Sequence, residues 1–188
     1  VLVNTSRGLI NQLERKHNYE LQNYDVGSYS TENLQLYFTP SEENIAKIVE
    51  ILNIAEREIH CALRSLNYEL LENTLIKKEE EGLKVRLYID SDYMGNKRIY
   101  LPYTRFSDLN NETMMHNNYC IIDDKILLTG SLIFNKNTLN ENFHDFLIIN
   151  STALADLYNS DFWKMYNNQS FEFKRTVQAE FVNLNDNI

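Results

Sequence analysis

A histidine in the second half of the chain stands at the entrance to two predicted strands. His116 precedes an apolar run at 119–122, an Asp123-Asp124 turn and a second apolar run at 125–129 that ends in Gly130-Ser131. This pattern predicts a β-hairpin with the histidine at its mouth. Histidine titrates near neutral pH and can act as a nucleophile or as a proton donor, so His116 is a candidate for catalytic chemistry.

These residues resemble the signature of the phospholipase D superfamily, H-x-K-x4-D-x6-G-S. His116, Asp123, Gly130 and Ser131 stand at the matching positions, whereas Asn118 stands where the family has its lysine. The resemblance implies a phosphodiesterase that uses no metal and no other cofactor, and that cleaves its substrate through a covalent phosphohistidine. Two facing copies of the motif are needed for this reaction.

The chain carries one copy of the motif. The resemblance therefore implies a symmetric homodimer, in which His116 of one subunit is the nucleophile and the partner subunit's His116 is the general acid. It also implies that Asp123 orients the imidazole of its own subunit or holds the motif strands together, and that Gly130 and Ser131 bind phosphate oxygens. The acidic residue that the family has further along the chain is expected at Asp145, with His144 and Glu141 nearby.

Asn118 has two explanations, which stay open. It marks either an inactivated enzyme or a site that recruits another cation, because an uncharged carboxamide cannot neutralise a phosphate. Losing one preorganised donor of this kind costs about 3 kcal/mol, or about a hundredfold in rate. Lys125 and Lys136 flank the motif beyond its turn, where exposed surface positions are expected.

The charge of the chain bears on its substrate. The 188 residues carry a formal net charge of -9, which argues against strong non-specific binding to duplex nucleic acid. Lys97 and Arg98 lie in a polar and aromatic segment at 91–114, where they are expected to bind substrate beside stacked bases or a lipid headgroup. The leading reading is an endonuclease-like enzyme acting on DNA or RNA. The alternatives are a phospholipase or phosphatidyl transferase, and an inactive protein that binds phosphodiesters.

Alternating patterns position this motif within an α/β domain. Strands are predicted at 34–38, 59–66 and 83–90, separated by helices at 40–57 and 68–81, with Thr39 as the cap and Pro40 as the first residue of the first helix. A strand at 146–149 and a helix at 151–166 follow the motif. We expect a mixed, largely parallel sheet flanked by helices on both faces. An arm or peripheral helix at 1–32 would precede this catalytic domain at 33–166, and an extension at 167–188 would follow it.

Two cysteines, Cys61 and Cys120, lie in apolar runs, and buried free thiols are favoured over a disulfide. His60 is expected to be a core histidine. No apolar run approaches the roughly 20 residues of a transmembrane helix. The chain begins at Val1 without an initiator methionine, so an upstream signal peptide or anchor stays open and the localisation is unassigned.

Overall fold

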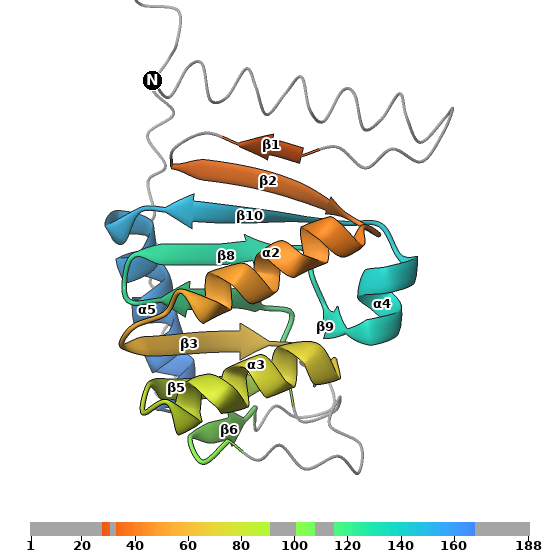
Figure 1. Cartoon of the computed structure of the whole chain (residues 1–188). Helices are drawn as coiled ribbons and strands as arrows, with labels where there is room; N and C mark the ends of the chain where they lie inside the picture. Colours follow the sequence, from red (N-terminus) through yellow and green to blue (C-terminus); the bar gives the residue numbers. More distant parts are fainter. Residues whose placement is uncertain (1–27, 31–32, 91–100, 108–114, 168–188) are drawn as a thin grey trace, which may run out of the picture.

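Eight strands form one sheet in the computed structural model of the chain, which describes residues 28–30, 33–90, 101–107 and 115–167 (Figure 1). Their order across the sheet is β1-β2-β10-β8-β7-β3-β5-β6. The strands are β1 (Ser28–Ser30), β2 (Leu34–Thr39), β3 (Glu58–Leu63), β5 (Lys84–Ile89), β6 (Thr104–Phe106), β7 (Asn118–Ile122), β8 (Ile126–Gly130) and β10 (His144–Asn150). β1 falls within the predicted arm, so the sheet begins before residue 33.

Most neighbouring strands in this sheet are antiparallel. Parallel pairing is confined to β3 with β5 and β5 with β6. The predicted α/β class, with a mixed sheet between helices, is confirmed, but the expectation of a largely parallel sheet is wrong. The reason is that the hairpin β7–β8 and the strand β10 insert between β2 and β3, where local periodicity could not place them.

Helices cover both faces of the sheet. In Figure 1, α2 (Glu42–Asn53) and α3 (Glu69–Glu80) lie in front of it and α5 (Thr152–Tyr166) lies behind it. The first layer buries the larger apolar cluster, which includes Ile48, Leu75 and Phe146, and the second buries a smaller one around Phe162. The short helix α4 (Lys136–Glu141) and a two-stranded sheet of β4 (Leu66–Asn67) and β9 (Phe134–Asn135) lie beside the main sheet.

The start of α2 differs from the prediction by two residues. Ser41, not Thr39, is the N-cap, and its hydroxyl oxygen accepts a hydrogen bond from the Asn44 N–H at 3.3 Å. Pro40 lies before the cap and follows a cis peptide bond, while Thr39 ends β2. The end of α3 at Glu80 lies within one residue of the predicted end at 81, and Gly82 takes a positive φ of 93° just after it.

The two cysteines form a disulfide, so the expectation of free thiols is wrong. Cys61 of β3 and Cys120 of β7 are directly paired in the antiparallel register, with their Cα atoms 4.1 Å apart. Their positions along the chain do not reveal this pairing, because it depends on β3 and β7 being neighbours. The disulfide fixes the register of these two strands.

His60 is a core histidine, as predicted, with 2% of its surface exposed. Its Nδ1 lies 2.9 Å from the Asn159 Oδ1 and its Nε2 lies 3.0 Å from a nitrogen of Arg86. A guanidinium can only donate, so this Nε2 accepts, and the imidazole is satisfied while neutral. Burial is the largest influence and lowers the pKa of His60, against the opposing effects of Asn159, Glu58 and Asp124.

Candidate active site

Both ends of the motif meet at one edge of the sheet. β7 begins there at Asn118, β8 ends there at Gly130 and β10 begins there at His144. β3 ends at the same edge, because Leu63 pairs with Asn118 in the antiparallel register. In Figure 1 this edge is the right-hand side of the sheet, where α4 and β9 also lie.

His116 is exposed at this edge and lies beside an arginine of the neighbouring strand. Arg64 directly follows β3, and its Nη1 is 3.3 Å from the His116 Nδ1. The Arg64 backbone N–H donates to the Asn118 Oδ1 at 3.2 Å, and the Asn118 amide donates to the His116 carbonyl oxygen at 3.3 Å. Asn118 thus joins the arginine to the histidine, a relationship that motif spacing alone could not reveal.

The structure brings two of the predicted site residues, Ser131 and Asp145, together. The Ser131 hydroxyl donates to the Asp145 carboxylate at 2.9 Å and accepts from the Asp145 backbone N–H at 3.0 Å. Gly130 permits this approach at a φ of 154°, because a Cβ there would collide with the Asp145 carbonyl oxygen and lie 2.7 Å from the Phe146 Cα. Gly130 therefore has a packing reason to be glycine, whether or not it contacts substrate.

Strand alternation separates His144 from Asp145. Phe146 belongs to the apolar cluster under α2 and α3, so His144, two residues earlier, is directed to that face and Asp145 to the other. Cys120 belongs to the same cluster, so Asn118 and the motif histidine share the face of His144. His144 is 9% exposed, and its Nε2 has no hydrogen-bond partner among the described residues. His144 is therefore a further candidate for the site, although Asp145 is the residue expected from the sequence at this position.

Asp123 lies at the opposite end of β7 from His116. Its carboxylate accepts hydrogen bonds from the backbone N–H groups of Glu56, Arg57 and Glu58, at 2.9, 2.8 and 3.0 Å. Burial alone would raise the pKa of Asp123, but these three donors and the Arg57 charge together lower it. Of the two roles expected for Asp123, holding the motif strands fits these contacts, whereas orienting the imidazole does not, because the intervening strand separates the two side chains.

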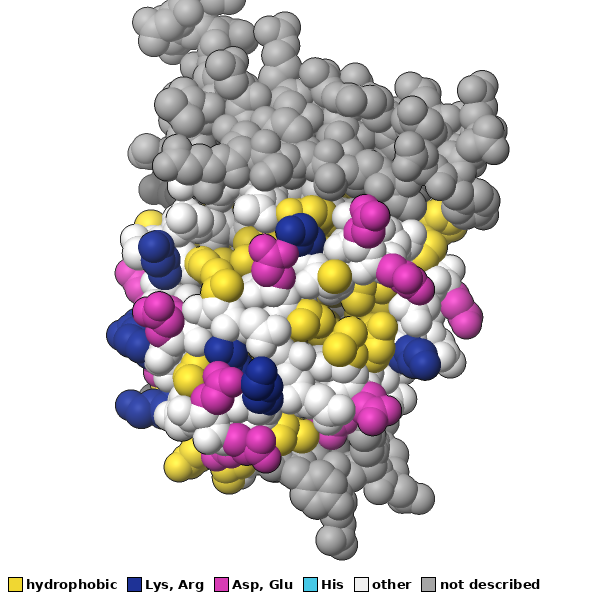
Figure 2. Space-filling view, in the orientation of Figure 1, with side chains coloured by type: hydrophobic (Ala, Val, Ile, Leu, Met, Phe, Trp, Pro, Cys, Tyr) yellow, Lys and Arg dark blue, Asp and Glu magenta, His cyan; other side chains and the backbone are white. Residues whose placement is uncertain are grey.

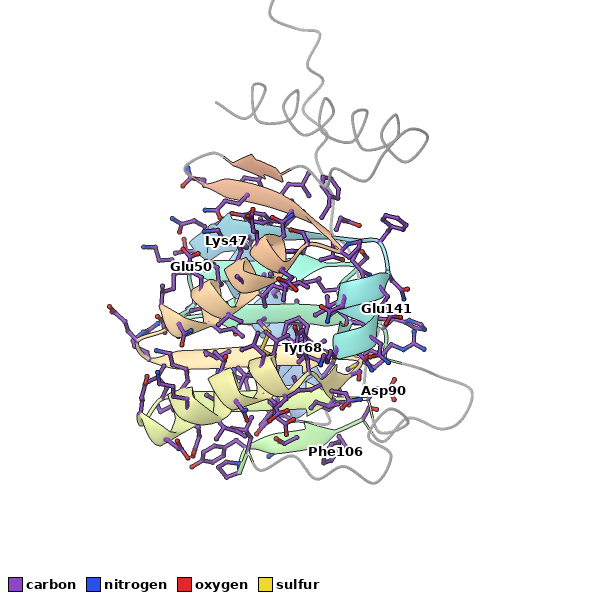
Figure 3. The ribbon with its side chains drawn as sticks, turned by 45° about the vertical axis from the view of Figure 1, so that its right-hand side comes forward. Lys47, Glu50, Tyr68, Asp90, Phe106 and Glu141 are labelled. Atoms are coloured by element: carbon purple, nitrogen blue, oxygen red, sulfur yellow. A yellow bond between two sulfur atoms is a disulfide. The ribbon has the colours of Figure 1, made fainter. Side chains whose placement is uncertain are left out.

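A buried carboxylate of another strand holds the start of the motif. Asp90 follows β5, is 2% exposed, and accepts a hydrogen bond from the Met115 backbone N–H at 3.1 Å. Figure 3 labels Asp90 at the same edge of the sheet as Glu141 of α4. Asp90 therefore anchors the residue directly before His116. An acidic residue at the end of a buried strand is a signal that could have identified it.

The remaining predicted residues do not join this group. Lys97 and Arg98 lie outside the described residues, so their role as substrate contacts stays a prediction. Lys125 and Lys136 are exposed, as expected. In the described ranges, no three His, Cys, Asp or Glu side chains are gathered so that they could hold a metal ion.

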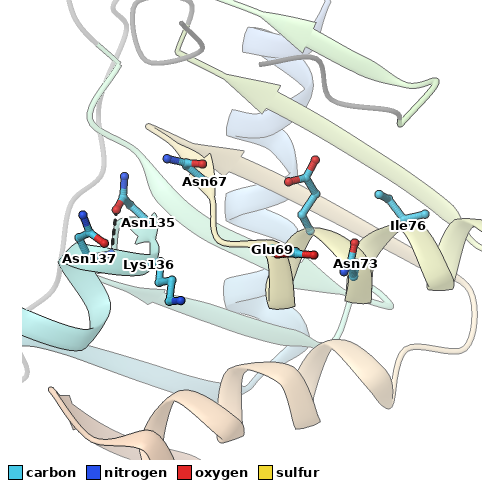
Figure 4. Close-up of a pocket in the computed structure, with 8 residues that line it drawn as sticks. Asn67, Glu69, Asn73, Ile76, Asn135, Lys136 and Asn137 are labelled. Atoms are coloured by element: carbon cyan, nitrogen blue, oxygen red, sulfur yellow. Dashed lines mark hydrogen bonds between the residues drawn. The ribbon is translucent and has the colours of Figure 1, made fainter. Parts of the chain in front are cut away.

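A pocket of about 580 Å³ lies beside the motif edge (Figure 4). It is formed where β4, which follows Arg64, pairs with β9, which follows Ser131, and where α3 begins. Carboxamides make up half of its lining, together with two carboxylates, one lysine and one isoleucine: Asn67, Asn73, Asn135, Asn137, Glu69, Glu72, Lys136 and Ile76. Such a lining suits a polar group with hydroxyl or amide functions.

The described surface carries no extended basic face in the view of Figure 2, where Lys and Arg side chains are interspersed with Asp and Glu. Exposed aromatic side chains occur at the motif edge instead. Phe106, at the end of β6, is 43% exposed, and Phe143, just before β10, is 48% exposed. Figure 3 labels Phe106 near Asp90. No helix in the described part of the chain is long and apolar enough to cross a membrane.

The chain is similar to a protein family and to several known proteins. A family profile described as "Cardiolipin synthase, PLD-like domain" matches residues 48–166. The chain is 27% identical over 146 residues to a phospholipase D of Rickettsia prowazekii (strain Madrid E), covering 75% of this chain and 71% of that protein. It is 23% identical over 141 residues to the mitochondrial cardiolipin hydrolase of Mus musculus, covering 71% and 64%. The crystal structure of Nuc, a phospholipase D family member from Salmonella typhimurium, superposes with a TM-score of 0.63 at 17% identity, covering 75% of this chain and 95% of Nuc.

Proposed function

The chain belongs to the phospholipase D-like family, and from this premise we propose that it is a metal-independent phosphodiesterase with His116 as its nucleophile. The observation that carries the proposal is the placement of His116, exposed at the edge where both ends of the motif meet and within 3.3 Å of a guanidinium. A buried imidazole could not reach a phosphorus atom, whereas the exposed imidazole of His116 is open to a substrate.

The proposed reaction has two steps. A lone pair of the His116 imidazole attacks the phosphorus, so that a P–N bond forms while the bond from phosphorus to the leaving oxygen breaks. A second imidazole gives its proton to that oxygen. Water then attacks the phosphohistidine, its proton passes to the second imidazole, and the P–N bond breaks, which restores both histidines.

The second imidazole comes from the partner subunit's His116 in a two-fold symmetric dimer. The chain supplies one motif, and a two-fold axis through the motif edge would bring two copies to one phosphate. His144 does not replace it in this scheme, because its side chain is 9% exposed and its Nε2 is buried. The disulfide favours assembly in an oxidising compartment, where such bonds persist.

We propose nucleic acid as the leading substrate, in single-stranded form. The acidic chain, with a net charge of -9, disfavours the dense phosphates of a duplex, while exposed aromatic side chains can stack on unpaired bases. Phe106 and Phe143 also favour a second candidate, a phospholipid, since exposed aromatic rings beside the catalytic edge can enter a membrane interface. The pocket at β4 and β9 would hold a polar group next to the scissile phosphate.

Cleavage assays in EDTA test these proposals. The substrates are bis(p-nitrophenyl) phosphate, a single-stranded oligonucleotide and vesicles containing cardiolipin. We expect activity in EDTA, an acid-labile phosphohistidine detected by mass spectrometry after rapid quenching, and a loss of about a thousandfold or more in His116→Ala. Lys125→Gln, which removes an exposed charge at the far end of the hairpin, is the matched control. Tight substrate binding without turnover would instead identify an inactive binding protein.

Mixing experiments test the shared site. At constant total protein, mixtures with the His116→Ala protein should show activity roughly proportional to the square of the wild-type fraction, because each mixed dimer has one nucleophile and no general acid. Activity proportional to the amount of wild-type chain, or a monomer by light scattering at assay concentration, would overturn the shared site.

A further inference from the structure

We propose that Arg64 supplies the positive charge that binds the substrate phosphate, in the place of the lysine that the motif lacks. The inference rests on the proposed function, since it concerns the same phosphate. Asn118 occupies the lysine position of the motif and is uncharged. The cation that lies beside His116 is Arg64, whose Nη1 is 3.3 Å from the His116 Nδ1.

The position of Arg64 follows from the sheet. Leu63 pairs with Asn118 across β3 and β7, so the next residue of the chain lies beside the start of β7, where the motif histidine emerges. The Cys61–Cys120 disulfide fixes this register two residues before Leu63 on β3 and two residues after Asn118 on β7. A cation from β3 therefore reaches the same edge as a cation from the motif strand would.

Asn118 acts in this arrangement as a positioning residue. Its Oδ1 accepts from the Arg64 backbone N–H at 3.2 Å and its amide nitrogen donates to the His116 carbonyl oxygen at 3.3 Å. Both polar ends of the carboxamide are thus used within the protein. A lysine in its place could donate but could not accept, so it would lose the bond to Arg64.

The guanidinium also suits the chemistry. It stays charged at any physiological pH and presents paired N–H donors that match two phosphate oxygens. Without substrate, the Arg64 Nη1 can only donate to His116, which holds a neutral imidazole in the tautomer with its proton on Nε2. When the guanidinium turns to a bound phosphate, the Nδ1 of His116 loses its hydrogen bond and its lone pair becomes available. The positive charge of Arg64 then lies beside the phosphate oxygens, where negative charge grows during the reaction.

Substitution of Arg64 tests the inference with two independent measurements. We expect Arg64→Gln to lower the turnover of bis(p-nitrophenyl) phosphate about a hundredfold and to weaken inhibition by inorganic phosphate, with Arg64→Lys retaining part of both. Added guanidinium ion should restore part of the activity of Arg64→Ala, which a purely structural role would not allow. Lys125→Gln removes the same charge from an exposed position and should leave both values unchanged.

The outcomes separate the two proposals. Wild-type rate and wild-type phosphate inhibition in a folded Arg64→Gln protein would overturn the role of Arg64 and leave the phosphodiesterase intact. A wild-type chain with no turnover would overturn the proposed enzyme. In that case, calorimetry of phosphate binding to the wild type and to Arg64→Gln would test the role of Arg64 by itself. A wild type that does not bind phosphate would overturn that role. Should Arg64→Gln not fold, the folded Arg64→Lys protein and its retained charge provide the comparison.

Discussion

His116 and Asp123, the histidine and the aspartate of the motif, lie at opposite ends of β7. One is exposed at the edge that carries the site, and the other accepts hydrogen bonds from three backbone N–H groups at residues 56–58. In the proposed enzyme, one strand of the motif therefore joins the nucleophile His116 to Asp123, whose carboxylate holds neighbouring backbone in place. The two should be separable by mutation.

Asp123→Ala should lower stability more than it lowers catalysis. The substitution leaves three backbone donors without their acceptor, and we expect a loss of about 2 kcal/mol in the free energy of unfolding, measured by urea denaturation. Turnover of the protein that remains folded should change less than threefold. Asp156→Ala, at an exposed position on α5, is the control. A large fall in turnover with unchanged stability would return Asp123 to a catalytic role.

The free energy of unfolding should fall on mild acidification because of His60. Burial lowers the pKa of this residue in the folded protein, so between that value and about 6.5 the unfolded chain binds more protons. Stability contributed by the neutral ring is thus complete above about pH 6.5 and declines as the pH falls below it. Denaturation midpoints at pH 7.5 and 5.5 measure the difference, which His60→Gln should reduce. The charged neighbours Glu58, Arg86 and Asp124 remain in that variant, so an unchanged pH dependence would assign the effect to them.

Reduction of the Cys61–Cys120 disulfide should destabilise the protein by about 4 kcal/mol. The estimate follows from the loop entropy released when a sequence separation of 59 residues is no longer closed. Denaturation with and without a phosphine reductant measures it, and Cys61→Ala/Cys120→Ala should be insensitive to the reductant. Equal midpoints for the wild type under both conditions would show that the bond adds nothing to stability.

The Asn118→Lys substitution distinguishes a site that lacks a phosphate-binding cation from one in which Arg64 supplies it. With Arg64 as the phosphate cation, the substitution breaks the acceptor bond to the Arg64 N–H and places two cations together, so the turnover of bis(p-nitrophenyl) phosphate should fall. An increase of about tenfold or more would mean that the site lacks a cation and that Arg64 does not supply it. Asn117→Lys, one position earlier and on the other face of the strand, controls for added charge.

Local patterns predicted the elements but not their neighbours. Hydrophobic periodicity predicts the strands around Phe38, Leu87 and Ile148 and the helices α2, α3 and α5, because burial of one face places apolar residues at regular intervals along the sequence. The pairing of β3 with β7 produces no such pattern in the sequence. Three features missed or mistaken from sequence depend on that pairing or on strand alternation: the disulfide, the contact of Arg64 with His116 and the placement of His144. The edge strands β1, β6 and β9 were missed because two or three residues are too few to show a period.

The covalent link between β3 and β7 also closes a ring of backbone that contains α3, β5 and β6. A protease that cut any peptide bond inside this ring would leave a two-piece molecule that migrates as one on a gel until thiols are added. Comparing digests run with and without reductant would thus show where the ring is open to attack, and a nicked protein could keep its paired strands in register.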